Sequence, residues 1–598
     1  MSTPKGIRYI PAIDGLRAIA VISVILYHLG LKWIPGGFLG VDLFFVISGY
    51  VITRLLLDSI QRSGGLDLKG FYVGRIRRLL PPLVFMLIIT TFYVGVFAPD
   101  SIKRLLTDTP FALSGLMNWW LVFKHQDYFE SFGRPPLLQH TWSLGVEAQF
   151  YLFWPLVLLL VLKFFGKKVI PTAALLIATF SGIALFLASI RADLSSNQSV
   201  SHVYFGTDTH SIGLFLGSAL AVSWIPQNLS ANIERRAQDF IDFVGVFGLL
   251  GLLASFILIN ESDPTSYRIA FPLVGIFGCA IILSIVHPAS RFAPLLQHPV
   301  MVWIGERSYA IYLWHWIVFQ LTRPAQDLAG STWALYSFRI LIVLALSDIS
   351  LRWIELPIRN GILSLWIKGL KYRSKAVQNR QRAFLFTGLL AISLALVTIS
   401  NNALDIANRN QQVVRDLFKE NQVATESKTS GLWVVGDSVI LGIRNSLESI
   451  SHIGLINARV GRQAPELLTV IKHDKARMSD RKTILDLGNN NRLTYNEIDS
   501  IFNELKDQPL VIVVNTAVPR DWRDENNSLI AKVAANYPNV KIIDWAQKSE
   551  NHPEYFAPDG VHLIPAGIAA YVDARSEEHT SELQSHSDLV CRLLLEKK

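Results

Sequence analysis

Cysteine and charge are both scarce in this chain. Only two cysteines, Cys279 and Cys591, occur among 598 residues, so neither a disulfide framework nor a cysteine-based metal site can be built. Charged residues make up 17% of the sequence, whereas soluble domains carry about 25%. Hydrophobic residues reach 51%, and they lie in long blocks between Tyr9 and Ser400. A wholly soluble protein is therefore excluded.

The charges that are present divide unevenly along the chain. Residues 1–400 hold 33 Lys and Arg against 20 Asp and Glu, a net +13, whereas residues 401–574 hold 19 against 22, a net −3. This division predicts a membrane domain over 1–400, a polar linker over 401–430 and a soluble domain over 431–574. The basic residues stand at the ends of apolar blocks, as membrane topology requires, and form no continuous basic stripe. Nucleic-acid binding is therefore not expected.

Twelve blocks approach the roughly 20 apolar residues that span a bilayer. They lie near 10–30, 38–57, 79–97, 105–123, 143–163, 169–189, 204–224, 242–259, 269–286, 302–321, 334–353 and 383–400. The basic clusters between them can all be cytoplasmic only if one block between the third and the sixth does not cross. The block 105–123 is the weakest, since Asp108, Pro110, Gly115 and Asn118 interrupt it.

We therefore expect an all-α membrane domain of about eleven spans plus one re-entrant segment. Its N-terminus would lie in the cytoplasm of a bacterial inner membrane, and the C-terminal domain would lie outside. Twelve true spans are the alternative, and they would place the soluble domain in the cytoplasm.

The soluble domain alternates short β-rich runs with helix-like stretches, which is typical of a doubly wound α/β fold with a parallel sheet. Five strands are expected at Leu432–Val435, Ile453–Ala458, Thr483–Leu487, Leu510–Val514 and Val540–Trp545. Ligand sites of such sheets lie at the carboxyl ends of the strands. Ser438 follows the first strand, Gly461 the second and Asn490 the third, so a site is expected where these residues meet.

These residues permit nucleophilic acyl transfer. Ser438 would be the nucleophile on a strand-to-helix turn, with His562 as general base and Asp559 orienting the imidazole. The backbone N–H groups of Ser438 and Gly461, with the Asn490 side chain, would bind the oxyanion. The alternative is structural: a Gly-Asp-Ser after a strand is often only a helix cap, and an Asp-Gly-Val-His is often only a turn.

In this order the residues resemble the SGNH hydrolase and esterase superfamily, whose four name residues correspond to Ser438, Gly461, Asn490 and His562. The resemblance covers about 431–574. The segments Val460–Gln463, Val518–Arg520 and Asp559–Leu563 look closest to the extracellular domain of peptidoglycan O-acetyltransferases. One departure is Asn489, where that group usually has Thr.

Polar residues inside apolar blocks are functional candidates because a bilayer makes them costly. Arg17 and His28 stand eleven residues apart, which on a helix is about 20° of rotation and roughly 16 Å of rise, so both share one face. Asp14 is one turn from Arg17 and is expected to pair with it. Glu147 is a second isolated ionisable group, at the start of a block. Packing or interfacial roles are the alternative for Arg17 and His28, and pairing with an Arg or a headgroup position is the alternative for Glu147.

The motifs Asp14–Arg17, His28, Gly40–Tyr50, Thr141–Leu144, Glu147 and Tyr312–His315 resemble membrane acyltransferase family 3 over about 8–360. The resemblance implies transfer of an acyl group from cytoplasmic acyl-CoA to the outer face, with Arg17 and His28 as a catalytic pair. Arg75 and Arg78 would then clamp the CoA phosphates, although Arg75, Arg77 and Arg78 also fit a purely topological role. His210 departs from the family, which usually has Arg there.

The sequence as a whole thus predicts an O-acyltransferase that uses acetyl-CoA as donor substrate, with no bound cofactor or metal. Its partners would be the bilayer, acyl-CoA inside and a glycan outside, with the muramic-acid hydroxyl of peptidoglycan as the expected acceptor. Lipopolysaccharide or another surface polysaccharide is an alternative acceptor. A membrane-anchored extracellular esterase and an exporter are the other hypotheses, but eleven spans are excessive for an anchor and no inverted repeat is visible.

The last 24 residues, 575–598, fit neither domain. They contribute nothing to the α/β pattern, and their first part resembles a translated sequencing adapter. We expect this segment to be non-native, which leaves Cys279 as the only native cysteine. A genuine amphipathic tail is the alternative.

Overall fold

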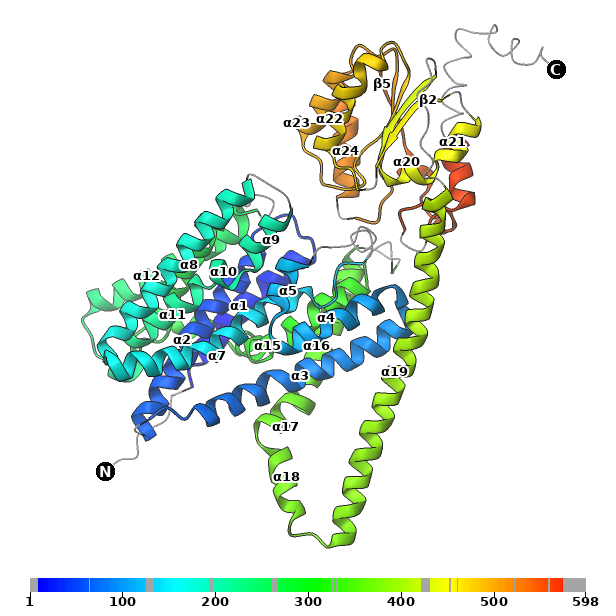
Figure 1. The fold of residues 1–598 in the computed structure, drawn as a ribbon. Helices are drawn as coiled ribbons and strands as arrows, with labels where there is room; N and C mark the ends of the chain where they lie inside the picture. Colours follow the sequence, from blue (N-terminus) through cyan, green and yellow to red (C-terminus); the bar gives the residue numbers. More distant parts are fainter. Residues whose placement is uncertain are drawn as a thin grey trace, which may run out of the picture. The chain divides into compact units, whose positions relative to one another are not determined.

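The structure is a computed structural model of the chain (Figure 1). It describes residues 9–63, 65–124, 134–193, 197–260, 267–323, 327–328, 332–420, 431–450, 453–459, 461–520, 522–557 and 560–573. The chain divides into two compact units, and the division falls between Leu404 and Asp405. Asp559 and the segment 575–598 lie outside the described residues.

The first unit is all-helical, as expected. Its longer helices are α1 (Pro11–His28), α2 (Gly40–Ser63), α3 (Leu68–Phe97), α4 (Ile102–Ser114), α5 (Met117–Phe123), α7 (Trp142–Phe164), α8 (Ile170–Asp193), α9 (Asn197–Phe205), α11 (Ile212–Ser223), α12 (Arg235–Leu258), α13 (Tyr267–Ile285), α15 (Pro299–Leu321), α16 (Thr332–Ile349), α18 (Ile362–Leu370) and α19 (Lys375–Glu420). Short helices α10 (Thr207–His210), α14 (Ala293–Leu296) and α17 (Leu356–Arg359) and the turns η3 (Gln139–Thr141) and η7 (Ser350–Glu355) connect them.

Nine helical stretches within the described part of the chain are long and apolar enough to cross a membrane. They account for nine of the twelve blocks, and α15 is also 23 residues long but carries Glu306 and Arg307. The block 105–123 is two short helices, α4 and α5, separated by Gly115 in the left-handed conformation (φ +72°). At about 1.5 Å per residue neither helix spans a bilayer, so the weakest block is not one continuous helix. The number of spans stays a prediction.

The block 204–224 differs from a single continuous span. It consists of the end of α9, the four-residue α10 and the twelve-residue α11. Polar contacts hold the break: Asn118 Nδ2 donates to Phe205 O (3.1 Å) and to Thr207 Oγ1 (2.9 Å), and Thr207 Oγ1 donates to Gln149 Oε1 (2.6 Å). Backbone and side-chain groups that leave a helical ladder within a membrane need such partners. The same network anchors α5.

Glycines let the helices of this unit approach closely, as small residues do in membranes. A Cβ on Gly305 of α15 would lie 1.8 Å from the backbone oxygen of Asp14 in α1, and one on Gly15 would lie 1.8 Å from Leu296 O. A Cβ on Gly49 of α2 would lie 1.9 Å from Leu214 O in α11. The helix that carries Arg17 and His28 is therefore seated against α15 backbone to backbone.

The second unit is a five-stranded parallel sheet with helices on both faces, as expected. Its strands are β1 (Leu432–Gly436), β2 (Ile453–Ala458), β3 (Thr483–Asp486), β4 (Val511–Val514) and β5 (Val540–Ile543), in the order β2-β1-β3-β4-β5. The helices are α20 (Ser438–Gly442), α21 (Arg444–Ile450), α22 (Ala464–Asp474), α23 (Tyr495–Glu504), α24 (Arg523–Ala534) and α25 (Trp545–Lys548).

Alternating strand residues supply the two faces of this sheet. Trp433 and Val435 of β1 pack in the core under α22, α23 and α24, whereas Val434 packs in the core under α20 and α21. Figure 1 shows the two helical layers on opposite sides of the strands. The strand order changes direction at β1 and β3, where doubly wound sheets open a site at the carboxyl ends of the strands.

Candidate active sites

Ser438 begins α20 at the carboxyl end of β1. Asp437 caps this helix, because its Oδ1 accepts a hydrogen bond from Val439 N (2.9 Å). The Ser438 side chain is fully buried, and its Oγ has no hydrogen-bond partner among the described residues. Gly436 is required just before the turn, since a Cβ there would lie 2.4 Å from Ile440 Cγ1. The nucleophile predicted from the sequence thus stands on a tight strand-to-helix turn.

Asn490 lies against the capping carboxylate. Its Nδ2 donates to Asp437 Oδ2 (2.6 Å) and to the backbone oxygen of Arg462 (3.1 Å). Both amide hydrogens of Asn490 are therefore engaged in this structure. For Asn490 to bind an oxyanion, one of these two bonds has to be given up. The oxyanion role of Asn490 remains a prediction.

The Asp437 carboxyl group is an unusual buried acid. Burial raises its pKa, and hydrogen bonds from Val439 N and the Asn489 amide oppose that shift. His562 lies near enough to oppose it as well. The structure therefore brings Asp437, Asn490 and His562 into one electrostatic neighbourhood beside Ser438.

Arg462 ties the ends of β1 and β2 together. Its Nη1 donates to Gly436 O (3.0 Å) and Asn457 O (2.6 Å), and its Nη2 donates to Asn457 Oδ1 (2.8 Å). Burial lowers the pKa of this guanidinium. Neighbouring Gly461 has φ +72°, a conformation suited to glycine. Sequence reasoning noted Arg462 only as part of a motif, because the carbonyl groups it holds belong to other segments.

His562 is buried, at 3% exposure, next to Gly560 (φ +69°). Its backbone oxygen accepts a hydrogen bond from Ala557 N (2.6 Å), which closes the turn that presents the ring. Asp559, the third predicted member of the triad, is outside the described residues. The triad therefore stays a prediction, with two of its members placed.

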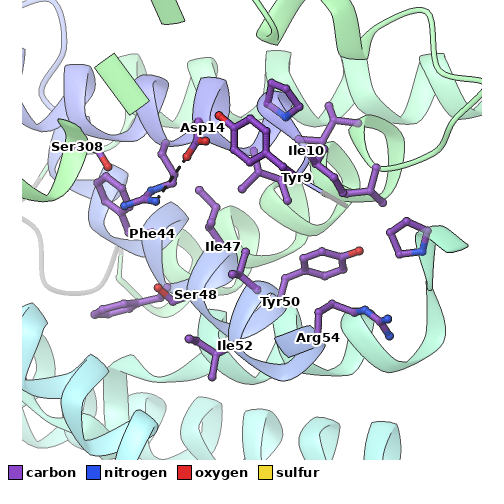
Figure 2. A pocket seen from close by; sticks show the side chains of 18 of the residues that line it. Tyr9, Ile10, Asp14, Phe44, Ile47, Ser48, Tyr50, Ile52, Arg54 and Ser308 are labelled. Atoms are coloured by element: carbon purple, nitrogen blue, oxygen red, sulfur yellow. Dashed lines mark ion pairs between the residues drawn. The ribbon is translucent and has the colours of Figure 1, made fainter. Parts of the chain in front are cut away.

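The membrane unit contains a cavity of about 1090 Å³, and Figure 2 shows part of its lining, including Asp14 and Ser48. Four of the predicted residues also line it: Arg17, Arg75, Arg78 and Glu147. Arg77 is not part of the lining, which fits a helix on which positions 75 and 78 share a face. Arg75 Nε is buried there with no hydrogen-bond partner among the described residues.

Glu147 is held by hydroxyl groups in this cavity. Ser48 Oγ donates to its Oε1 (2.6 Å) and Tyr151 OH donates to its Oε2 (3.2 Å). Arg17 pairs instead with Asp14, as expected, at an N–O distance of 3.6 Å (Figure 2). The cavity wall thus presents several cations, one carboxylate with fixed orientation and several hydroxyls.

His28 is not among the residues that line this cavity. Its Nδ1 lies 3.2 Å from Nε2 of His315, and its ring also packs edge-on against Trp316. The sequence predicted that Arg17 and His28 share one helix face, but the structure separates them into a cavity and a histidine cluster. The sequence motif that contains His315 predicts no separate role for it.

His210, which departs from the family pattern, is paired in this chain. Its Nε2 lies 2.9 Å from Asp42 Oδ1 and its Nδ1 lies 2.6 Å from Tyr204 O. Both ring nitrogens therefore face acceptors, as the donors of an arginine would. Elsewhere, no group of three or more His, Cys, Asp or Glu side chains in the described ranges could hold a metal ion.

Comparison with known proteins gives a consistent result. A family model described as an acyltransferase domain matches residues 10–352. "Peptidoglycan O-acetyltransferase OatA" of Listeria monocytogenes is 34% identical, with 94% of this chain and 97% of the relative covered. "O-acetyltransferase OatA" of Staphylococcus aureus is 33% identical, with 95% of each covered. The solved C-terminal catalytic domain of Streptococcus pneumoniae peptidoglycan O-acetyltransferase A, with a methylsulfonyl adduct, is 25% identical, with 27% of this chain and 95% of that chain covered and a TM-score of 0.22.

Proposed function

Because this chain belongs to the acyltransferase family and is a membrane O-acetyltransferase, we propose that it moves acetyl groups from cytoplasmic acetyl-CoA onto peptidoglycan hydroxyls. Residues 1–400 would be the membrane acyltransferase domain, 401–430 the linker and 431–574 the extracytoplasmic transfer domain. The N-terminus would be cytoplasmic. The names of the relatives support peptidoglycan as the acceptor.

The cavity is the observation that supports acetyl-CoA as the donor. Its volume of about 1090 Å³ is slightly above the roughly 300–1,000 Å³ of small-molecule sites, which suits a ligand as large as a coenzyme thioester. Arg75 and Arg78 supply guanidinium groups of the kind that bind phosphates with two parallel hydrogen bonds. Arg17 would sit nearer the thioester, and the Glu147 carboxylate would orient polar groups around it.

In the first transfer, the acetyl group would leave the thioester of the donor. A hydroxyl oxygen attacks the acetyl carbonyl carbon, the new C–O bond forms and the C–S bond breaks. His28 does not line the cavity, so the acetyl end of the donor would extend past Tyr312 to reach it. His28 would then accept the hydroxyl proton and return it to the thiolate sulfur, so that free coenzyme A leaves as a thiol. The acetyl group is then carried on oxygen toward the outer domain.

The second transfer would use Ser438. Its Oγ attacks the acetyl carbonyl while His562 takes the Oγ proton, and Asp559 holds the imidazole in the required tautomer. The bond from the acetyl carbon to the carrier oxygen then breaks, and His562 gives its proton to that oxygen, so the carrier leaves as a hydroxyl and His562 is neutral again. The Ser438 and Gly461 N–H groups would bind the oxyanion, joined by Asn490 once its amide leaves Asp437 or Arg462 O. A sugar hydroxyl then attacks the acyl-enzyme, gives its proton to His562, and Ser438 leaves with that proton.

Two variants of the full chain test this proposal. Ser438→Ala is expected to abolish O-acetylation of purified cell-wall glycans, measured by mass spectrometry, and also hydrolysis of a soluble acetyl ester. His28→Ala is expected to abolish glycan O-acetylation but to spare ester hydrolysis, because that reaction needs only the outer domain.

Both variants must remain at wild-type levels in the membrane fraction, checked by immunoblot. Unchanged glycan acetylation in Ser438→Ala would remove the acyl-enzyme from the proposal. Wild-type glycan acetylation in His28→Ala would remove His28 from the first transfer. Acetyl groups found on lipopolysaccharide or another polysaccharide would overturn peptidoglycan as the acceptor.

A further inference from the structure

Three histidines from separate parts of the membrane unit form one cluster. His28 ends α1, His140 lies in η3 and His315 lies in α15. The ring centroids of His28 and His315 are 5.1 Å apart, and those of His140 and His315 are 5.9 Å apart. His140 and His315 are buried, at 4% and 0% exposure. Of these three, only His28 had a role predicted from sequence.

The hydrogen bonds of His315 decide which of its nitrogens carries hydrogen. Its Nδ1 lies 2.6 Å from the backbone oxygen of Tyr312. A carbonyl oxygen can only accept, so Nδ1 must be the donor. A neutral imidazole has one N–H, and therefore Nε2 of His315 keeps the lone pair.

The tautomer of His28 follows from that of His315. Nδ1 of His28 lies 3.2 Å from Nε2 of His315, and an N–H···N bond needs exactly one hydrogen between the two atoms. Because Nε2 of His315 is the acceptor, Nδ1 of His28 is the donor. In the neutral ring of His28 the lone pair is consequently on Nε2.

Tyr312 connects this arrangement to the cavity. Tyr312 lines the cavity together with Arg17 and Glu147. Its hydroxyl donates to His140 O (2.8 Å) and shares a hydrogen bond with Ser143 Oγ (2.8 Å), so both ends of the residue are fixed. A chain of contacts thus runs from the cavity wall through the Tyr312 carbonyl and His315 to His28.

We propose that His315 is a positioning residue that fixes His28 in the tautomer whose Nε2 acts as the base in acetyl transfer. This inference rests on the proposed function, in which His28 takes a proton from the attacking hydroxyl. Nε2 accepts that proton as the C–O bond forms and the thioester C–S bond breaks, and then returns it to the thiolate. In the other tautomer, Nε2 of His28 already carries a hydrogen. That N–H would face the hydroxyl group and could not accept its proton.

Matched substitutions at position 315 test the proposal in the full chain in detergent or liposomes. His315→Gln keeps an acceptor oxygen at the position of Nε2, whereas His315→Met has nearly the same length and shape but cannot accept well. General base catalysis is worth about 10²–10⁴-fold, so we expect His315→Met to lower kcat for acetyl transfer at least about 100-fold. We expect His315→Gln to stay within about tenfold of wild type on the same scale.

The KM for acetyl-CoA distinguishes a positioning role of His315 from a packing role. The cavity residues bind the donor in this scheme, so KM is expected to change less than about threefold in both variants. Ester hydrolysis by the outer domain serves as the internal control for folding. If His315→Met fails to reach the membrane, His315→Leu replaces it.

Three results would contradict the role proposed for His315. Equal loss of kcat in His315→Gln and His315→Met, or wild-type kcat in His315→Met, overturns the positioning role. A KM that rises in step with the loss of activity also overturns it. His28→Ala is measured in parallel: if it retains full transfer, the proposed function fails, whereas its inactivity with an active His315→Met rejects only the inference about His315.

Discussion

At the scale of single residues, the Ser438 site of the second unit is organised by groups that hold one another through hydrogen bonds. Asp437, Asn490 and Arg462 come from three segments, and each contacts another member of the set. The sequence predicted Asn490 from its place after a strand. The bonds that engage its amide could not be predicted, because Asp437 is 53 residues away along the chain.

The buried Asp437 gives a pH prediction. Burial raises its native pKa above the unfolded value of about 3.9, so the native state holds this proton more tightly than the unfolded state does. The stabilisation from this group is complete below the unfolded pKa and is lost as pH rises through the native pKa. In Asp437→Asn, which cannot titrate, we expect a smaller loss of stability of the second unit as the pH rises above the unfolded pKa of about 3.9.

Hydrogen–deuterium exchange of peptides from β1 and β3 measures this stability within the full chain. The exposed Asp524→Asn serves as the control and should keep the wild-type pH dependence. An Asp437→Asn variant with the same pH dependence as wild type would contradict the role assigned to the Asp437 proton.

At the scale of elements, backbone contact between helices sets the position of the membrane-site residues. Helix α1 carries both Arg17 and His28, and α15 carries Tyr312 and His315. The two helices meet where Gly305 faces the Asp14 backbone. A displacement at this crossing would move Arg17 in the cavity wall and separate His28 from His315.

Gly305→Ala is therefore expected to impair transfer strongly. Its Cβ would lie 1.8 Å from Asp14 O, and a backbone atom cannot yield as a side chain can. Overpacking of this kind costs about 1–3 kcal/mol, and we expect a lower thermal midpoint in detergent together with loss of acetyl-CoA turnover. Gly182→Ala is the matched control, because the nearest atom to its Cβ would be 3.9 Å away. Equal behaviour of the two variants would contradict this packing argument.

At the scale of the whole molecule, charge and span number together set the orientation. The seven basic residues between Arg359 and Arg382, with no acid among them, favour a cytoplasmic position. Helix α19 begins within this segment, at Lys375, and contains the last stretch long enough to cross a membrane in the described part of the chain. One crossing after a cytoplasmic segment would place the second unit outside.

Reporter fusions test this topology. Alkaline phosphatase, which is active only outside the cytoplasm, is expected to be active when fused at the C-terminus and inactive when inserted after Arg373. A fluorescent protein that folds only in the cytoplasm should give the reverse pattern. An inactive C-terminal phosphatase would instead support twelve spans and would place the glycan-transfer domain on the wrong side for its acceptor.

The sequence by itself determined what depends on neighbouring residues. Hydropathy marked the membrane half, strand periodicity predicted five parallel strands, and short motifs selected Ser438, Gly461, Asn490, His562, Arg17 and Glu147. Tertiary structure alone decided which of these meet. Arg17 and Glu147 share a cavity, whereas His28 contacts His315, 287 residues away. The block 204–224 is broken because Asn118 and Gln149, from other segments, hold Thr207. Such contacts join distant segments, so no local pattern encodes them.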